Sequence, residues 1–291
     1  MSVSDASRSG SAEATGPDGI LVLAKPPGPT SHDMVALVRR LAATRRVGHG
    51  GTLDPFASGV LPIFLGRATR VVEYHLADRK SYRATVCFGA TSSTDDLEGS
   101  LEQVPGPGPE RSALDSALEA FRGEIQQQPP AYSAIKVAGR RAYALARAGQ
   151  RPELRPRTVI IHSIEVVEWD ATDPARPIAV IEVESSAGTY VRAIARDLGA
   201  AVGSGAYLGS LTRTASGPFR LADAISVEAL RDAAAAGPER LRALLLPPEA
   251  GLERFPKVVL EPAEVAAIAR GQFVRPSQPV RSRGSVSPTS Q

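Results

Sequence analysis

The sequence predicts an α+β protein. Residues 81–90 alternate apolar and polar or small side chains, which is typical of a half-buried strand. Residues 31–41 repeat apolar side chains at helical spacing instead. Strand-like and helix-like segments follow one another without a regular strand–helix–strand alternation, so we expect a mixed architecture with no internal repeat.

The first folded elements are a buried strand and a helix. GILVLAKP, from residue 19, is apolar and short, and the prolines at 26, 27 and 29 end it in a turn. Ser31 is placed to cap a helix that runs to Leu41. A glycine-dense segment at residues 45–62 follows, and we interpret it as a loop and a candidate active site.

The later elements are predicted from pattern and composition. Three strands are expected at residues 81–90, 158–170 and 177–186, where β-branched side chains are frequent. Helices are expected at residues 110–121, 141–148, 190–201 and 226–246. The composition predicts a disordered leader at 1–18, a large folded domain at 19–248, a short module at 249–278 and a disordered tail at 279–291.

Composition narrows the class of protein. The 291 residues are 43% hydrophobic, enough for one large core or two moderate ones. Cys87 is the single cysteine, so neither an internal disulfide nor a cysteine-based metal site is expected. No apolar run is long enough to cross a membrane, and the first residues lack the features of a signal peptide, so we predict a cytoplasmic protein without a membrane partner.

Basic residues are clustered although the net charge is only +3. Residues 39–46 contain four arginines, and residues 136–157 contain seven basic side chains against one acid, Glu153. Such clusters suit a nucleic-acid backbone, but a solvated helix face would look the same.

Residues 48–62, GHGGTLDPFASGVLP, form the most specific motif. An Asp before Pro in a glycine-rich segment is most often a turn former. The whole segment, however, resembles the catalytic loop of TruB-type pseudouridine synthases, GHxGTLDPxAxGxLP, at every fixed position.

Further blocks resemble the same family in the same order. They are KPPGPTSHD at 25–33, KSYRA at 80–84, QPPAYSAIK at 128–136 with GRRAY at 139–143, and SAGTYVR at 186–192 with RDLG at 196–199. LGSLTRTASGPF at 208–219 resembles the family's LxxLRRTxxGPF. The resemblance implies the pseudouridine synthase fold, with a central mixed or antiparallel sheet flanked by helices. It covers about residues 19–219.

The resemblance also implies catalytic roles. Asp54 is the expected nucleophile, and Arg192 is the expected cation that holds the pKa of its carboxyl down against desolvation. Tyr82 is expected to stack on the extruded uracil, and Tyr190 to pack beside it and assist removal of the C5 proton. Judged by pattern alone, each tyrosine would be an ordinary packing residue. The reaction needs no metal or cofactor, and none is expected.

Contacts with RNA are expected at a second set of residues. His49 is expected to fill the space of the flipped base, with a local loop hydrogen bond as the alternative. Lys25 is expected either to support the loop or to contact a phosphate. Leu211 is expected to line the uracil pocket with Arg213 nearby. The basic residues Lys136, Arg140 and Arg141 complete the set.

Three departures separate this chain from the family pattern. Thr212 replaces the first arginine of the RRT block, and Ser93 replaces an acid in the TxTxD block, although Asp96 keeps the last acid. The residues after 249 resemble the beginning of an RNA-binding PUA-type domain but are too few for a whole one. We therefore expect a short PUA-like remnant at 249–278.

Two functional classes remain open. One is an enzyme that isomerises uridine 55 in the TΨC arm of tRNA, acting alone as a monomer without a protein partner. The other is an RNA-binding or RNA-folding protein on the same fold. Asp54 and Arg192 favour the enzyme, because a buried ion pair is costly to desolvate and does not help a protein that only binds RNA. Attack at the ribose C1′ and attack at the uracil ring both remain possible.

Overall fold

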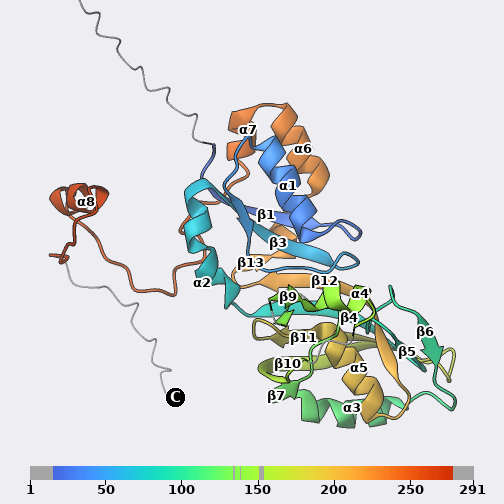
Figure 1. Ribbon diagram of the computed structural model, residues 1–291. Helices are drawn as coiled ribbons and strands as arrows, with labels where there is room; N and C mark the ends of the chain where they lie inside the picture. Colours follow the sequence, from blue (N-terminus) through green and yellow to red (C-terminus); the bar gives the residue numbers. More distant parts are fainter. Residues whose placement is uncertain (1–15, 134, 138, 151–153, 278–291) are drawn as a thin grey trace, which may run out of the picture. The chain divides into compact units, whose positions relative to one another are not determined.

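The computed structural model describes residues 16–133, 135–137, 139–150 and 154–277. The chain divides into two compact units, residues 1–248 and 249–291. The first unit is built on a nine-stranded sheet whose main path runs β1-β3-β12-β4-β11-β10-β7, with β2 beside β3 and β13 beside β12 (Figure 1). All its pairs are antiparallel except β3 with β12, so the predicted mixed sheet is confirmed.

The strands of this sheet come from the whole length of the unit. Their bounds are β1 Gly19–Lys25, β2 Val47–His49, β3 Ser58–Leu65, β4 Lys80–Phe88, β7 Gly123–Gln127, β10 Arg157–Asp170, β11 Ile178–Ser185, β12 Ala206–Ser216 and β13 Phe219–Arg220. Two small hairpins lie outside it, namely β5 Ala90–Ser92 with β6 Leu101–Gln103, and β8 Lys136–Val137 with β9 Arg140–Arg141. The predicted strands at 19–25, 81–90, 158–170 and 177–186 are confirmed within a few residues.

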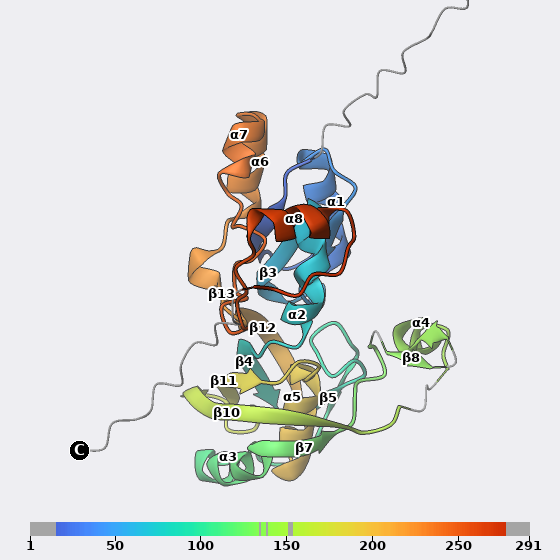
Figure 2. The same ribbon diagram turned by 90° about the vertical axis from the view of Figure 1, so that its left-hand side faces the viewer.

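The helices pack on two parts of the sheet and enclose two hydrophobic clusters. They are α1 Ser31–Leu41, α2 Val72–Leu76, α3 Arg111–Leu118, α4 Ala142–Arg147, α5 Val191–Ala201, α6 Val227–Ala235 and α7 Pro238–Arg242. One cluster joins α1, α6 and α7 to β1 and β3, and the other joins α3 and α5 to β4, β11 and β12 (Figures 1 and 2). The two cores lie along a single sheet, and β3 and β12 are the neighbouring strands where they meet.

The cap of α1 differs from the prediction. Thr30 is the N-cap, and its side chain and that of Asp33 form a reciprocal capping box. Ser31 instead turns inward, where its hydroxyl accepts from the amide of Leu53 at 2.9 Å and donates to the Leu53 carbonyl at 3.1 Å. The predicted cap was wrong by one residue because Ser31 holds the glycine-dense segment.

That segment is also more ordered than a loop. Its ends are the strands β2 and β3, which pair with each other, so only residues 50–57 connect them. Gly59 lies at φ +116°, and a Cβ there would lie 2.2 Å from the Arg213 carbonyl oxygen on β12. Glycine is therefore required for β3 to approach β12 at this point.

A second correction concerns the alanine-rich segment 226–246. It forms two short helices rather than one, because Gly237 lies at φ +115° and Pro238 begins the next helix at its first turn. β12 and β7 were not predicted as strands at all. β12 lies in the middle of the sheet and carries LGSLTRTAS, in which glycine, serine and threonine hide the alternation.

The second unit is small. In its described residues, 249–277, it contains one helix, α8 Pro262–Ala269, which Pro262 and a capping box at Glu261 and Glu264 begin. No strand is assigned in these described residues. Within the described chain no helix is long and apolar enough to cross a membrane.

Candidate active site

Asp54 lies in the β2–β3 connection and faces the first turn of α5. Its Oδ2 lies 3.0 Å from Nε of Arg192, with the Asp54 side chain 35% exposed and the Arg192 side chain 5% exposed. The Nε–H of Arg192 is not aligned as a hydrogen bond. The two residues are 138 positions apart in sequence, so the fold brings together the nucleophile and the cation that the motifs predicted.

Arg192 is held by more than Asp54. Its Nη1 donates to the Thr94 carbonyl at 3.0 Å and lies 3.3 Å from Oδ2 of Asp96, and its Nη2 donates to the Tyr132 carbonyl at 2.9 Å. Asp96 is buried, and its Oδ1 accepts from the Thr94 hydroxyl and the amide of Glu98. One guanidinium therefore bridges two carboxylates and fixes the angle at which it meets Asp54.

Burial raises the pKa of Asp54 above its ordinary value of 3.8. The charge of Arg192 opposes this effect, Asp96 adds to it, and Lys25 opposes it more weakly. Arg192 acts in the predicted direction, but desolvation outweighs it. A carboxylate in this setting is poorly solvated and partly accessible, which are the properties of a reactive nucleophile.

Lys25 supports the connection that carries Asp54. Its side chain is 1% exposed, and Nζ donates to the carbonyls of Pro55 at 3.1 Å, Ala57 at 2.6 Å and Pro26 at 2.9 Å. Desolvation lowers the pKa of Lys25 to about 8. Of the two roles open to Lys25, loop support is the one that these contacts provide, and its burial leaves no surface for a phosphate.

Tyr190 is the N-cap residue of α5 and is positioned by two side chains. The Gln127 amide donates to the Tyr190 carbonyl at 3.0 Å and accepts from its backbone amide at 2.8 Å. The Arg157 guanidinium lies over the Tyr190 ring, 4.6 Å from its centroid. Gln127 and Arg157 are partners in the β7–β10 ladder, so one strand pair holds both the backbone and the ring.

Tyr82 lies on β4, and its ring packs against the larger hydrophobic cluster. Burial raises the pKa of Tyr82, and the charge of Arg213 opposes this. Leu211, two residues before Arg213 on β12, is 7% exposed in the same cluster. Arg213 is only 1% exposed, so this conformation offers its side chain no RNA contact.

Two of the three sequence departures have visible contacts. The Thr212 hydroxyl lies 2.9 Å from the Ser58 hydroxyl, its partner in the parallel β12–β3 pair. The Ser93 hydroxyl accepts from the Ser100 amide at 3.0 Å in the loop between β5 and β6. Both therefore satisfy neighbouring polar groups and leave the Asp54–Arg192 pair intact.

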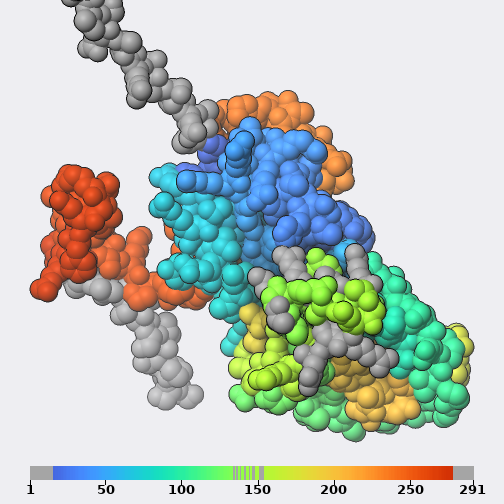
Figure 3. All heavy atoms as spheres, viewed as in Figure 1, coloured from blue at the N-terminus to red at the C-terminus, as the bar shows by residue number. Residues whose placement is uncertain are grey.

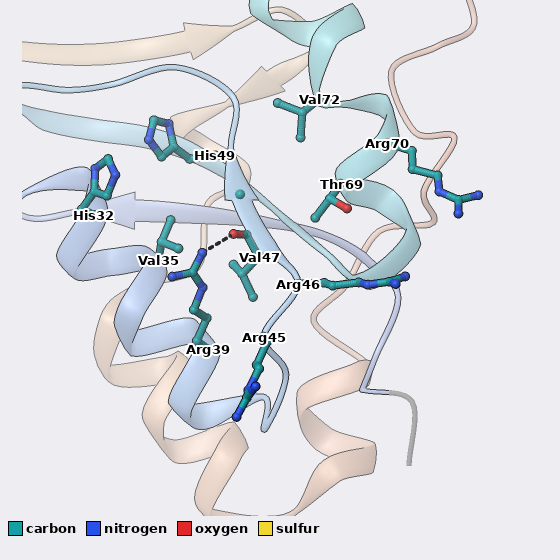
Figure 4. A pocket seen from close by; sticks show the side chains of 11 residues that line it. His32, Val35, Arg39, Arg45, Arg46, Val47, His49, Thr69, Arg70 and Val72 are labelled. Atoms are coloured by element: carbon teal, nitrogen blue, oxygen red, sulfur yellow. Dashed lines mark hydrogen bonds between the residues drawn. The ribbon is translucent and has the colours of Figure 1, made fainter. Parts of the chain in front are cut away.

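His49 ends β2 and lies at the rim of a basic hollow (Figure 4). Its Nδ1 accepts from the Gly51 amide at 3.3 Å, which is the local loop bond considered above. Burial lowers the pKa of His49. The hollow has a volume of about 640 Å³, and its basic lining residues are His32, Arg39, Arg45, Arg46, His49 and Arg70.

The segment between β7 and β10 carries the second basic cluster. Figure 3 shows its green atoms on the face that also carries the blue N-terminal residues. Arg140 is exposed on β9, whereas the side chains of Lys136 and Arg141 lie outside the described part of the chain. The Tyr132 carbonyl connects this segment to Arg192.

Sequence reasoning missed three contributors to the site. Gln127 and Arg157 lie outside the recognised blocks, and Ser31 was taken for a cap. In the sequence, Gln127 stands in a QQQPP run and Arg157 is a basic residue at the start of a strand, and neither pattern indicates a contact with Tyr190. Only the pairing of β7 with β10 reveals it. No group of three potential metal ligands is present among the described residues.

Comparisons with known proteins agree with this arrangement. Residues 39–191 match the model of the TruB family pseudouridylate synthase N-terminal domain, and residues 192–253 match the tRNA pseudouridylate synthase B C-terminal domain. The chain is 46% identical over 259 residues to tRNA pseudouridine synthase B of Bradyrhizobium diazoefficiens, covering 88% of this chain and 74% of that one. It is 46% identical over 260 residues to the Mycobacterium tuberculosis protein of that name, covering 89% and 84%.

A solved structure extends the comparison to the fold. A chain of a Cbf5-Nop10-Gar1 complex superposes with a TM-score of 0.65 at 33% identity, covering 87% of this chain and 67% of that chain. The family models together match residues 39–253, which include Asp54, Tyr82, Tyr190 and Arg192. On this evidence the chain belongs to the TruB family of pseudouridine synthases and is an enzyme of the tRNA pseudouridine synthase B type.

Proposed function

We propose that the protein isomerises uridine 55 in the TΨC arm of tRNA to pseudouridine, with Asp54 as nucleophile. The observation that carries this proposal is the ion pair of Asp54 with Arg192 at 3.0 Å, in which the carboxylate is partly accessible and the arginine is buried. A binding protein would gain nothing from a buried charge pair that repels phosphate through its acid.

The reaction breaks the bond between uracil N1 and ribose C1′, turns the base, and forms a bond between C5 and C1′; C5 loses a proton and N1 gains one. If Asp54 attacks C1′, its bond to the ribose breaks as the C5–C1′ bond forms. If it attacks the uracil ring, its bond to the ring breaks after the C5–C1′ bond has formed, as the C5 proton leaves. Arg192 fixes the attacking carboxylate. Tyr82 stacks on the extruded uracil, and Tyr190 assists the proton step.

The uridine must leave its stack to reach Asp54, at a cost of a few kcal/mol. His49 is the residue proposed to occupy the vacated space, because it joins the loop of Asp54 to the basic hollow. The hollow then receives the phosphate backbone on either side of the flipped nucleotide. Its exposed arginines Arg45, Arg46 and Arg70 favour this role, because phosphate contacts position an RNA without reading its sequence.

The choice of substrate rests on the relatives. The similar Bradyrhizobium and Mycobacterium proteins carry the name tRNA pseudouridine synthase B. We therefore propose tRNA as the substrate, and we expect the protein to act on it alone, as a monomer.

The deciding experiment is a base-resolved pseudouridine assay on an unmodified tRNA transcript, without added metal or cofactor. We expect the wild-type protein to form pseudouridine in the T-loop, and Asp54→Asn to reduce the rate by on the order of 10⁴-fold or more while it still binds tRNA. Asp115→Asn, an exposed carboxylate on α3 that pairs with Arg111, is the matched control and should keep the full rate.

Two results would contradict the proposal. Product at another position would refute the choice of uridine 55. Absence of product from wild-type protein that binds tRNA would favour the RNA-binding alternative. Assistance of tRNA folding is a secondary proposal, and it fails if Asp54→Asn does not raise the yield of folded tRNA above that of a control without protein.

A further inference from the structure

Arg213 is a fully buried cation beneath the loop that carries Asp54. Its side chain is 1% exposed on β12, opposite Tyr82 of β4 and Gly59 of β3. Nε donates to the Val60 carbonyl at 2.8 Å, and the terminal nitrogens contact the carbonyls of Gly51 at 3.2 Å and Thr52 at 3.5 Å. The guanidinium therefore holds the loop before Asp54 and the strand after it.

Tyr82 and Arg213 are paired residues on adjacent strands, so the register of the sheet fixes their relative position. The charge of the guanidinium opposes the rise in the pKa of Tyr82 that burial causes. A single rigid group thus holds the backbone of the Asp54 loop and lies on the strand beside the residue proposed to stack on the uracil. The planar fork of arginine donates from three separate nitrogens, whereas a lysine has a single ammonium nitrogen.

Lys25 forms the other half of the support. It holds the carbonyls of Pro55 and Ala57, which follow Asp54, whereas Arg213 holds those of Gly51 and Thr52, which precede it. Two buried cations thus bind four backbone carbonyls of the loop, two before Asp54 in sequence and two after it. Among the described residues Arg213 forms no ion pair with a carboxylate, and its hydrogen-bond partners are the carbonyls of Val60, Gly51 and Thr52.

We propose that Arg213 is a positioning residue that fixes the Asp54 loop and the Tyr82 ring relative to each other. It acts through both residues without touching the substrate. The inference rests on the proposed function, since it concerns the geometry of the same reaction. The alternative is that Arg213 only stabilises the fold. The two roles predict different reaction rates and different hydrogen exchange in the Arg213 variants.

The test compares Arg213→Lys and Arg213→Gln with the wild-type protein in single-turnover pseudouridine formation on a tRNA transcript. We expect a rate loss of about 10²-fold for either variant, because misplacement by about 1 Å has effects of this size. The dissociation constant for tRNA should change by less than about twofold, since Arg213 is buried. Tyr82→Phe should cost less in the Arg213→Lys protein than in the wild type.

The structural alternative is tested by Leu230→Ala. Leu230 is 1% exposed on α6, in the other hydrophobic cluster, so its loss lowers the melting temperature without touching the loop. If Leu230→Ala lowers the rate as much as an Arg213 variant of equal melting temperature, the proposal is overturned. A wild-type rate in Arg213→Lys, or full additivity with Tyr82→Phe, would overturn it as well.

Hydrogen exchange supplies a readout that does not depend on activity. The amides of residues 51–54, 56 and 57 should exchange faster in Arg213→Gln than in wild type, while those of α6 remain unchanged. Unchanged exchange in 51–57 would sink the proposal even if the rate fell. Conversely, if the wild-type protein forms no pseudouridine, the proposed function fails, whereas the loop exchange still decides whether Arg213 holds the loop.

Discussion

Two groups of cations, one at the loop of Asp54 and one at the basic hollow, differ in their exposure and in what they contact. Lys25 and Arg213, at the nucleophile loop, are each 1% exposed and each contact three backbone carbonyls. Arg45, Arg46 and Arg70, at the basic hollow, are exposed. The buried group is bound to the protein itself, and the exposed group is available to a ligand.

The difference shows how basic residues serve two tasks in this protein. A buried cation that has all its donors occupied cannot bind RNA, but it fixes backbone that would otherwise move. An exposed arginine fixes little and attracts phosphate over several ångströms, in a way that salt screens. Substitutions in the first group should therefore change the rate, and substitutions in the second should change affinity.

Arg192→Lys tests a third buried cation at the Asp54 loop and should have the largest effect among the substitutions of basic residues. Lysine keeps the charge but cannot bridge Asp54 and Asp96 while it donates to the carbonyls of Thr94 and Tyr132. We expect a single-turnover rate lowered by roughly 10²- to 10³-fold with tRNA affinity almost unchanged. A single-turnover assay with radiolabelled transcript already bound to the protein measures the rate, and a filter-binding titration measures the affinity.

The control for this substitution lies one turn later on the same helix. Arg196→Lys alters a more exposed arginine that pairs with Asp95 and Asp197, and it should cost only a few-fold in rate. Equal losses in both variants would show that helix α5 is generally sensitive and that Arg192 has no special role at Asp54.

Arg70→Glu tests the exposed side, with a smaller effect. Reversal of one charge in the hollow should weaken tRNA binding by about tenfold at low salt and reduce the slope of log affinity against log salt by about one or more. The single-turnover rate at saturating protein should stay near that of the wild type. Arg231→Glu, an exposed arginine on α6 outside the hollow, is the matched control. An unchanged salt slope for Arg70→Glu would remove the hollow from the RNA surface.

The sequence predicted the fold class and the chemistry of the loop, but not how the loop is held. Asp54, Arg192, Tyr82 and Tyr190 stand in long motifs, and the family match covers all four. The motifs also contain Arg213, yet its residue type suggested RNA. The direction of a side chain in a central strand such as β12 depends on register, and glycine, serine and threonine gave that strand no clear alternation.

Other predictions failed for similar reasons. Residues 45–62 were interpreted as one loop, since glycines hid the short β2 and the first half of β3. Gln127 was overlooked because its role depends on pairing with β10, 30 residues later in the chain. The roles of individual site residues, the PUA-like remnant and the predicted domain boundaries stay predictions.

The smallest expected effect is the pH dependence, which separates chemistry from stability at the loop. Burial raises the pKa of Asp54, so the rate should fall as pH drops through a value above the ordinary 3.8, when the nucleophile is protonated. The folded state binds this proton more tightly than the unfolded state. Between the two pKa values, protonation of Asp54 therefore adds stability as pH falls, and the acid loss of rate should not coincide with unfolding.

The expected loss of rate at alkaline pH has a different cause. Desolvation lowers the pKa of Lys25 to about 8, and above that pH its Nζ loses the charge that strengthens its bonds to the Pro55 and Ala57 carbonyls. We expect the single-turnover rate to decline by a few-fold between about pH 7.5 and 9. In Lys25→Arg this decline should move to higher pH. Thermal stability in the same buffers should not fall, because a folded pKa below the unfolded one adds stability as pH rises above about 8, and tRNA affinity should stay level. A flat rate profile in that range would mean that neutral Lys25 holds the loop equally well, and that the charge of the buried group matters less than its hydrogen bonds.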